Sequence, residues 1–252
     1  MSAVLDISDL NGGYGRLTVF RDVSFAVSSD RTLGLLGANG AGKTTSFRMT
    51  VGMIRPDRGR VRFLGQDVSQ LPMYVRARRG MGYLSQEPSV FQRLSVEDNL
   101  RAICETMRFT RAQRQAKINE LLDQFGLNIV RKSMARNLSG GERRKLEIAR
   151  ALITSPRLIL LDEPFSGVDP RAVEELRGEI LRLRSQGIAI LLTDHNVHET
   201  LRVTDRSYVI HQGCVISTGT PAQLINDPVV RDTYLGNTFR GDEFGPAPGN
   251  GN

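Results

Sequence analysis

At 252 residues, the chain is long enough for one large domain with a buried core, or for one domain that carries an inserted subdomain. Its apolar share of 40% and charged share of 24% are those of a globular protein, and its two cysteines have neither metal-binding nor redox spacing. No run of about 18 apolar residues is present that could cross a bilayer. We therefore expect a cytoplasmic protein that is neither secreted nor membrane-spanning by itself. The net charge of +7 comes from scattered arginines without interleaved aromatics, which favours solvated basic faces, with acidic lipid head groups as a second interpretation.

The N-terminal third predicts strands and one helix. Residues 4–27 alternate in a strand-like way, with an expected turn at Asn11-Gly12-Gly13. A short buried strand at 32–36 is followed at once by the glycine-rich stretch GANGAGKTT and a helix over 45–52. Further strands are expected at 61–64 and 81–84. This is the strand, loop and helix context that a phosphate-binding loop requires.

The middle third predicts helices, and strands return after it. Apolar residues recur at helical spacing over 96–107, 111–125 and 139–154. The nearly unbroken apolar runs at 158–161 and 188–192 are typical of parallel strands buried on both faces, with a helix over 171–185 between them. A hairpin is expected from 207–211 and 214–217, and the Gly-, Pro- and Asn-rich segment 241–252 is expected to be disordered.

The strongest motif is Gly37-Ala38-Asn39-Gly40-Ala41-Gly42-Lys43-Thr44, which matches G-x-x-x-x-G-K-[ST] at every fixed position. The glycines let backbone amides curl around a β-phosphate. Lys43 adds a mobile positive charge for the phosphate oxygens, and Thr44 offers a hydroxyl to Mg²⁺. A flexible turn that matches by chance is the alternative, and the strand before the loop and the helix after it argue against that alternative.

Two further polar groups follow apolar strands. Asp162 and Glu163 end the run LILLDEP, where Asp162 can hold the Mg²⁺ shell and Glu163 can polarise a water for attack on the γ-phosphorus. His195 leaves the strand at 188–192 and could donate a hydrogen bond to the γ-phosphate. The alternative for Asp162 and Glu163 is that two acids merely end a strand before a proline turn. The alternative for His195 is a histidine that only makes structural hydrogen bonds.

The stretch LSGGERRKLEIAR raises a different question, because two glycines are poor helix formers. Ser139 and Glu142 predict a capping box at the start of a helix. Gly140 and Gly141 are not explained by the cap, and bare amides at a helix N-terminus predict an anion that comes close to the backbone.

With these motifs in place, residues 4–240 resemble the nucleotide-binding subunits of ATP-binding cassette (ABC) transporters. The motifs stand in the order of that family: Tyr14, the phosphate loop, Gln86 in LSQEP, LSGGE, LILLDEP, Gly167-Val168-Asp169 and His195. The resemblance implies an α/β fold: a RecA-like phosphate-loop core with a mostly parallel sheet, an antiparallel β subdomain and an inserted helical subdomain. The expected division places the core and β subdomain at 1–86 and 156–240 and the helical subdomain at 87–155.

The resemblance also implies roles for individual residues. ATP and Mg²⁺ are the implied cofactors. Tyr14 would stack on adenine, and Gln86 would contact the metal and the attacking water. Asp169 would face the opposite subunit of an ATP-dependent homodimer, although it could also simply cap the next helix. The full implied nucleotide-binding set is Tyr14, Gly37, Asn39, Gly40, Ala41, Gly42, Lys43, Thr44 and Thr45.

Within the family, the closest resemblance is to the ATPases of lipopolysaccharide export, carried by LPMYVRARRGMGYLSQEPSVFQRLSVEDNL, LLDEPFSGVDP, TDHNVHETL and YLGNTFR. ATPases of branched-chain amino acid importers share GANGAGKTT and a Tyr-Leu-Gly ending. A cassette ATPase that acts on nucleic acid is a third class, which usually has two cassettes or a coiled-coil insertion. The implied partners are transmembrane subunits on the inner membrane, with no nucleic acid expected.

The chain departs from the exporter pattern at three places. Ser85 stands where a proline is usual, Gln92 stands where arginine is usual, and 28–31 replaces a glycine-containing turn. None of them touches the hydrolytic residues. Phe91, Gln92 and Arg93 would lie near the groove that receives a helix of the membrane subunit, so Gln92 bears on the details of docking.

Overall fold

Two sheets organise the chain in the computed structural model, which describes residues 3–14, 17–236 and 239. The larger sheet has the strand order β10-β9-β3-β8-β7-β6, and every neighbouring pair is parallel except β10 with β9. Its strands are β3 (Thr32–Leu36), β6 (Met81–Leu84), β7 (Leu158–Asp162), β8 (Ala189–Thr193), β9 (Arg206–His211) and β10 (Cys214–Gly219). The parallel core predicted from the unbroken apolar runs is confirmed.

The smaller sheet is antiparallel, with the order β2-β1-β4-β5. It consists of β1 (Ala3–Tyr14), β2 (Leu17–Ser28), β4 (Arg58–Phe63) and β5 (Gln66–Asp67). The predicted turn at Asn11-Gly12-Gly13 is wrong, because these residues lie inside β1 and pairing with β2 continues to Tyr14 opposite Leu17. The pairing shifts register on both sides of Gly12, so the glycines accommodate an irregular strand.

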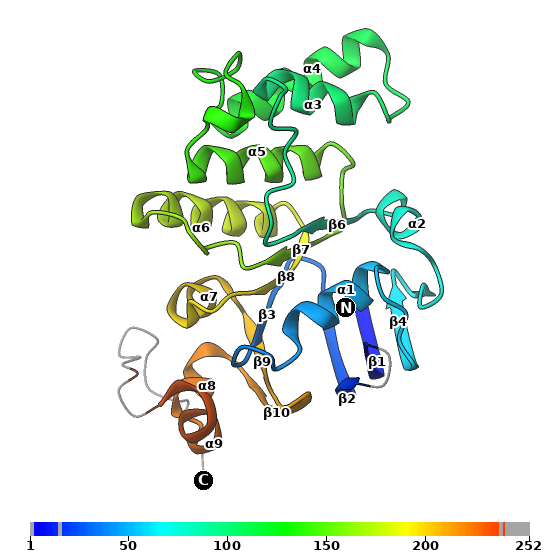
Figure 1. Ribbon diagram of the computed structural model, residues 1–252, viewed down its shortest axis with the longest axis vertical. Coiled ribbons are helices and arrows are strands. Elements are labelled where there is room, and N and C mark those ends of the chain that lie inside the picture. The colour runs from blue at the N-terminus through cyan, green and yellow to red at the C-terminus, as the bar shows by residue number, and fades with distance from the viewer. Residues whose placement is uncertain (1–2, 15–16, 237–238, 240–252) are drawn as a thin grey trace.

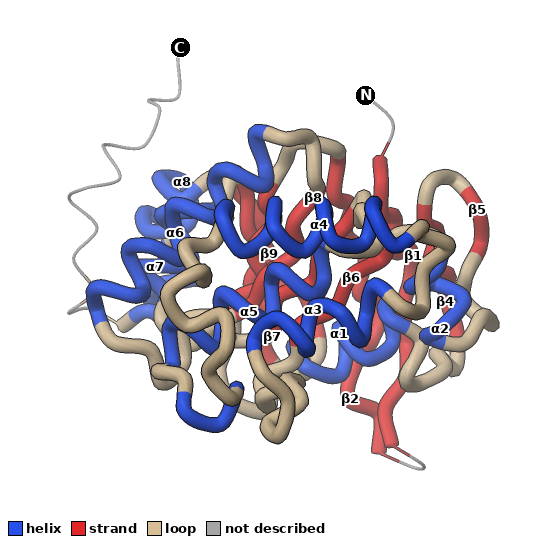
Figure 2. Tube along the Cα trace, turned by 90° about the horizontal axis from the view of Figure 1, so that it is seen from above, coloured by secondary structure: helices blue, strands red, loops and turns tan. Residues whose placement is uncertain are grey.

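Four consecutive helices, α3 to α6, form a stack on one side of the larger sheet. Figure 1 shows α3, α4 and α5 beyond α6, at the end of the molecule opposite the smaller sheet, and Figure 2 shows the same helices over the strands from above. The helices are α1 (Lys43–Val51), α2 (Met73–Arg78), α3 (Val96–Cys104), α4 (Arg111–Gln124), α5 (Gly140–Leu152), α6 (Pro170–Ser185), α7 (Val197–Val203), α8 (Pro221–Asn226) and α9 (Pro228–Val230).

The long helices were predicted and the short ones were not. The helices expected over 96–107, 111–125, 139–154 and 171–185 are confirmed as α3 to α6, with α3 ending three residues early at Cys104. By contrast, α2, α7, α8 and α9 have seven residues or fewer, too short for a helical period to stand out. The division of the chain at residues 87 and 155 stays a prediction. The segment 241–252, expected to be disordered, lies outside the described residues.

The core lies on both faces of the larger sheet. In β7, Ile159 and Leu161 pack into the cluster formed with the helices α3 to α6, whereas Leu158 and Leu160 pack into the cluster shared with α1 and the smaller sheet. All five residues of β7 are buried. This placement leaves the carboxyl ends of β3, β7 and β8 as the edge where polar side chains emerge. In the described ranges, no helix combines the length and the apolar composition of a membrane span.

Candidate functional site

The glycine-rich loop connects β3 to α1 and has the geometry of an anion cradle. Gly42 caps α1 with φ at 107°, a left-handed conformation that costs other residues free energy. A Cβ at this position would come within 2.7 Å of Cε1 of Phe20, so a side chain is also excluded by packing. The first turn of α1 carries no acidic residue, and its free amide groups therefore favour a bound anion.

The buried side chain of Lys43 folds back over this loop. Its ammonium group donates hydrogen bonds to the carbonyl oxygens of Gly37 at 2.7 Å and Ala38 at 3.0 Å. Burial lowers the pKa of Lys43, whereas the nearby carboxylates of Glu163 and Asp162 raise it. The loop thus holds a cation close to where a phosphate oxygen would bind.

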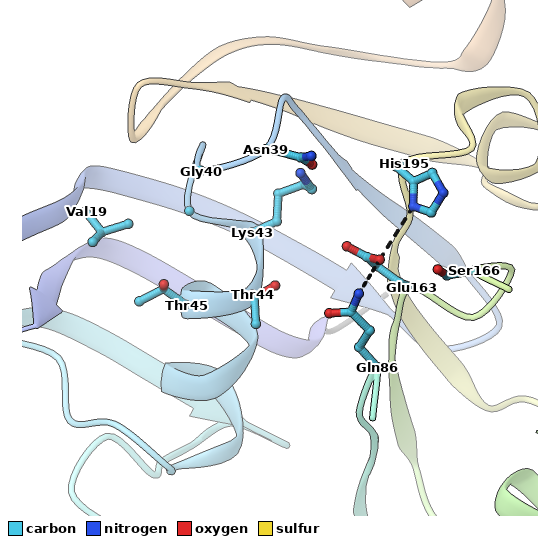
Figure 3. A pocket seen from close by; sticks show the side chains of 11 residues that line it. Val19, Asn39, Gly40, Lys43, Thr44, Thr45, Gln86, Glu163, Ser166 and His195 are labelled. Atoms are coloured by element: carbon cyan, nitrogen blue, oxygen red, sulfur yellow. Dashed lines mark hydrogen bonds and ion pairs between the residues drawn. The ribbon is translucent and has the colours of Figure 1, made fainter. Parts of the chain in front are cut away.

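A cavity of about 750 Å³ opens beside the loop. Thr44, Thr45 and Asn39 line it on the side of β3 and α1, and residues from other strand ends line the opposite side. Figure 3 shows Gln86, Glu163, Ser166 and His195 gathered across the cavity from Lys43. The full lining is Val19, Asn39, Gly40, Gly42, Lys43, Thr44, Thr45, Gln86, Glu163, Ser166 and His195. The structure therefore brings together at one place most of the residues predicted to act together, whereas the predicted Gly37 and Ala41 do not line the cavity.

Glu163 occupies the centre of the far wall. Its carboxylate oxygen Oε2 accepts a 2.8 Å hydrogen bond from Nε2 of Gln86 and lies 3.5 Å from Nδ1 of His195 (Figure 3). The backbone of Glu163 is left-handed, with φ at 50°, and its amide donates to the carbonyl of Thr193 at 2.8 Å. Such strained backbone persists where the surroundings fix it, and functional sites are a common place for it. The carboxylate is held by two side chains and is still open to the cavity.

Asp162 is buried at the end of β7 and differs from Glu163 in its surroundings. Its oxygen Oδ2 accepts a hydrogen bond from the hydroxyl of Tyr83 at 3.2 Å, and its Oδ1 is buried without a partner among the described residues. Burial raises the pKa of Asp162, and the Tyr83 hydroxyl lowers it. A free buried carboxylate oxygen fits a place in the ligand shell of Mg²⁺.

The protein supplies only part of such a shell. In the part of the chain that the structure describes, no group of three or more His, Cys, Asp or Glu side chains could hold a metal ion. Mg²⁺ usually binds proteins through one or two carboxylates together with substrate phosphates. Thr44 lines the cavity, whereas Asp162 is buried at the end of β7 and is not part of the lining; a hydroxyl and a carboxylate are groups that fit that arrangement.

Asp194 is a site residue that sequence reasoning missed. It is fully buried, and its two oxygens accept hydrogen bonds from the amides of Phe165 at 2.8 Å and Asn196 at 2.9 Å. Burial raises the pKa of Asp194, and these amides lower it. Asp194 therefore ties the loop after Glu163 to the segment that carries His195. Its position directly before His195 was the available signal.

The capping box at the start of α5 is confirmed. The Ser139 hydroxyl accepts from the amide of Glu142 at 3.2 Å, and the Ser139 amide donates to the Glu142 carboxylate at 2.9 Å. None of residues 139–142 lines the cavity beside the phosphate loop. Gly140 instead lines a smaller adjoining pocket of about 200 Å³ together with Gln86 and Glu163.

Packing between two helices explains why a glycine stands at position 141, and the sequence alone did not show this. A Cβ at Gly141 would come within 2.7 Å of the Cβ of Ala172 on α6, so the glycine permits α5 and α6 to pack closely. A Cβ at Gly140 would meet only the carbonyl oxygen of Gly167, at 3.5 Å, which is an ordinary contact. The interpretation that both glycines serve an approaching phosphate is therefore needed only for Gly140.

Asp169 and residues 91–93 are not part of the cavity lining. Asp169 caps α6, its Oδ1 accepting from the amide of Ala172 at 3.1 Å. Phe91 is 45% exposed, and the guanidinium carbon of Arg150 lies 4.6 Å from its ring centre. Gln92 and Arg93 are exposed beside it. Tyr14 ends β1, but its side chain lies outside the described residues.

Comparison with known proteins gives one consistent family. A family model described as "ABC transporter" matches residues 20–166. The chain is 49% identical over 240 residues to the "Lipopolysaccharide export system ATP-binding protein LptB" of Acidithiobacillus ferridurans, covering 95% of this chain and 100% of that protein. The protein of the same name from Escherichia coli strain K12 is 48% identical over 239 residues, covering 94% and 99%.

Solved structures agree with the fold. A solved ATP-binding cassette of an ABC transporter matches with a TM-score of 0.85 and 26% identity over 94% of this chain and 100% of its own. The cassette in its ADP conformation matches with a TM-score of 0.83, also at 26% identity, over the same shares of the two chains. The cavity beside the phosphate loop is thus found in a cassette fold, and the chain belongs to the ABC transporter family as one of its ATP-binding, ATP-hydrolysing subunits.

Proposed function

We propose that this chain hydrolyses ATP to power lipopolysaccharide export by separate transmembrane subunits, from the cytoplasmic face of the inner membrane. The observation that carries the cargo assignment is the identity of 48–49% to LptB proteins over 94–95% of the chain and almost their whole length. The observation that supports hydrolysis is the Glu163 carboxylate held across one cavity from Lys43.

ATP would bind with its phosphates on the loop 37–45. The Lys43 ammonium would exchange its hydrogen bonds with loop carbonyls for phosphate oxygens, and Tyr14 would stack on the adenine. Mg²⁺ would be held by Thr44, Asp162 and Gln86 together with the phosphates, and it would offset negative charge on the β- and γ-oxygens. The free Oδ1 of Asp162 supports this assignment.

Hydrolysis would be in-line attack of water on the γ-phosphorus, which converts ATP and water to ADP and phosphate. Glu163 would polarise the water as general base, and Gln86 would help to position it. His195, whose ring is 57% exposed toward the cavity side, would donate a hydrogen bond to the γ-phosphate. The existing contacts of Glu163 with Gln86 and His195 support these roles because they bring all three side chains within reach of one phosphate.

The complete site would be shared between two copies of the chain. Ser139, Gly140 and Gly141, with Glu142 behind them, would face the γ-phosphate that the partner copy holds, and Asp169 would lie at the same seam. Ser139 and Gly140 are exposed at the start of α5, where a second copy of the chain can reach them, and this supports an arrangement in trans. ATP would supply the negative charge between two cationic faces, so closure would depend on ATP and hydrolysis would release it.

Contact with the transmembrane subunits would involve Phe91, Gln92 and Arg93. All three side chains are exposed next to α3, and Phe91 is among the most exposed large apolar residues that the structure describes. Leu94, whose amide donates to the carbonyl of Phe91 at 3.0 Å, is exposed as well, and an apolar surface of more than one side chain favours a protein partner over solvent.

Glu163→Gln tests the hydrolytic assignment. It removes the general base but keeps the side-chain volume, so we expect ATP turnover to fall by about 10²-fold or more while ATP affinity stays within about twofold. Glu174→Gln on the exposed side of α6 is the matched control and should leave both values unchanged. Turnover at the parental rate in Glu163→Gln would show that another group is the base.

The cargo assignment is tested by the membrane partners. The native complex is purified through this chain, its membrane subunits are identified, and ATP turnover is measured in vesicles with lipopolysaccharide, with branched-chain amino acids, or with neither. Stimulation by lipopolysaccharide is expected. Stimulation by the amino acids with their importer subunits would replace the proposal, and turnover stimulated by DNA in a salt-dependent way would indicate the nucleic-acid class.

A further inference from the structure

Tyr83 has no role predicted from the sequence, yet it contacts Asp162. It lies on β6, which pairs with β7 so that Tyr83 is opposite Leu160. Its hydroxyl donates to Oδ2 of Asp162 at 3.2 Å, and its half-buried ring packs on the core cluster shared with α1. The ring therefore connects the edge strand of the sheet to the carboxylate at the end of the next strand.

This hydrogen bond makes the two oxygens of Asp162 different. The Tyr83 hydroxyl occupies Oδ2, whereas Oδ1 is buried and has no partner among the described residues. Fixing one oxygen also fixes the rotation of the carboxylate plane, and therefore the direction of the other oxygen. Hydrogen-bond partners that orient a metal-binding carboxylate in this way commonly determine how well it binds metal.

We propose that Tyr83 is a positioning residue, which holds Oδ2 of Asp162 so that Oδ1 points to the Mg²⁺ of bound nucleotide. The inference rests on the proposed ATP site and adds to it a residue on β6.

The test measures metal binding directly, with Mn²⁺ as the probe and ADP as a nucleotide that is not hydrolysed. Tyr83→Phe removes one oxygen atom and keeps the ring. We expect the affinity for Mn²⁺ in the ADP-bound full-length chain, measured by electron paramagnetic resonance, to fall by about tenfold. ADP affinity in the presence of EDTA should stay within about twofold of the parent.

Tyr208→Phe is the matched control. Tyr208 lies on β9 in the same sheet and packs against Phe25, 5.9 Å between ring centres, away from Asp162. It should leave the affinity for Mn²⁺ unchanged. In turnover assays, Tyr83→Phe should need more Mg²⁺ for half-maximal rate and should approach the parental rate at saturating Mg²⁺. A general loss of fold stability would not give this pattern.

The outcomes separate this inference from the proposed function. A parent that binds no nucleotide would refute both, whereas a parent that binds Mn²⁺ with ADP and a Tyr83→Phe variant of equal affinity would refute only the role of Tyr83. If Tyr83→Phe fails to fold, 3-fluorotyrosine in place of Tyr83 reports the contact in the folded protein. Its ¹⁹F resonance should shift when Mg²⁺ joins bound ADP, and an unchanged resonance would refute the proposal.

Discussion

Arg76 is the most consequential buried charge among the described residues, and replacing it gives a sharp prediction. Its side chain is 1% exposed and donates to four backbone carbonyls: Leu71 at 2.9 Å, Ser69 at 3.0 Å, Met49 at 2.8 Å and Thr50 at 2.6 Å. Met49 and Thr50 belong to the last turn of α1, where the carbonyl oxygens carry partial negative charge. Arg76 therefore closes the helix that starts at the phosphate loop.

The expected cost of Arg76→Met follows from these contacts. Four hydrogen bonds from a charged group, at about 1.5 kcal/mol each, amount to about 6 kcal/mol. Burial lowers the pKa of Arg76 from its ordinary value to about 10, which corresponds to about 3 kcal/mol against the buried charge and offsets part of that gain. We therefore expect the variant to lose about 3 kcal/mol of unfolding free energy, or about 6 to 12 °C in Tm for a chain of this size.

Thermal unfolding followed by circular dichroism measures this loss. The control is Arg78→Met on the same helix, because Arg78 is exposed and its guanidinium carbon lies over the ring of Tyr74, 5.8 Å from the ring centre, without a buried hydrogen bond among the described residues. It should lower Tm by no more than about 2 °C. If Arg76→Met unfolds within about 1 °C of the parent, the four carbonyl contacts do not stabilise the fold and the reasoning is wrong.

Three further predictions concern the helical layer. Gly141→Ala should destabilise the chain by about 1–3 kcal/mol through overlap with Ala172, as measured by urea unfolding, whereas Gly140→Ala should cost less than 1 kcal/mol. Ser139→Ala removes the cap of α5 and should cost about 1 kcal/mol in the same assay, and it should also lower turnover of the dimer without weakening ATP binding to the monomer. The hydrogen bonds from Arg131 and Lys132 lower the pKa of Glu97, so its contribution to stability is present above the unfolded pKa of about 4.5 and is lost as pH falls toward its folded pKa. Glu97→Gln should therefore be less stable than the parent at pH 7, and the difference in Tm should shrink below pH 4.5.

The sequence was sufficient to predict the site residues that directly follow the carboxyl ends of strands. Asp162, Glu163 and His195 were predicted because each follows an apolar run, and the carboxyl ends of parallel strands meet at one edge of a sheet. The structure brings Glu163 and His195 to the cavity that Lys43 lines. Local patterns were also sufficient for the capping box at Ser139, because both partners lie within four residues.

What sequence reasoning missed depends on contacts between distant segments. The hydrogen bond from Tyr83 to Asp162 joins residues that are 79 positions apart, and the contact of Gly141 with Ala172 joins two helices. No periodicity encodes such pairs. The predicted turn at residues 11–13 is wrong for a related reason. The same residue types occur in turns and in irregular strands, and only pairing with the partner strand distinguishes the two.

The side chains along β7 alternate between two cores, which limits changes in the length of this strand. Leu158 and Leu160 belong to one core, and Ile159 and Leu161 belong to the other, so deleting a single residue would exchange the two sets. The same deletion would carry Asp162 to the opposite face of the sheet. This strand can therefore accept substitutions more readily than insertions or deletions. The position of Asp162 and the packing of both cores depend on the same number of residues in β7.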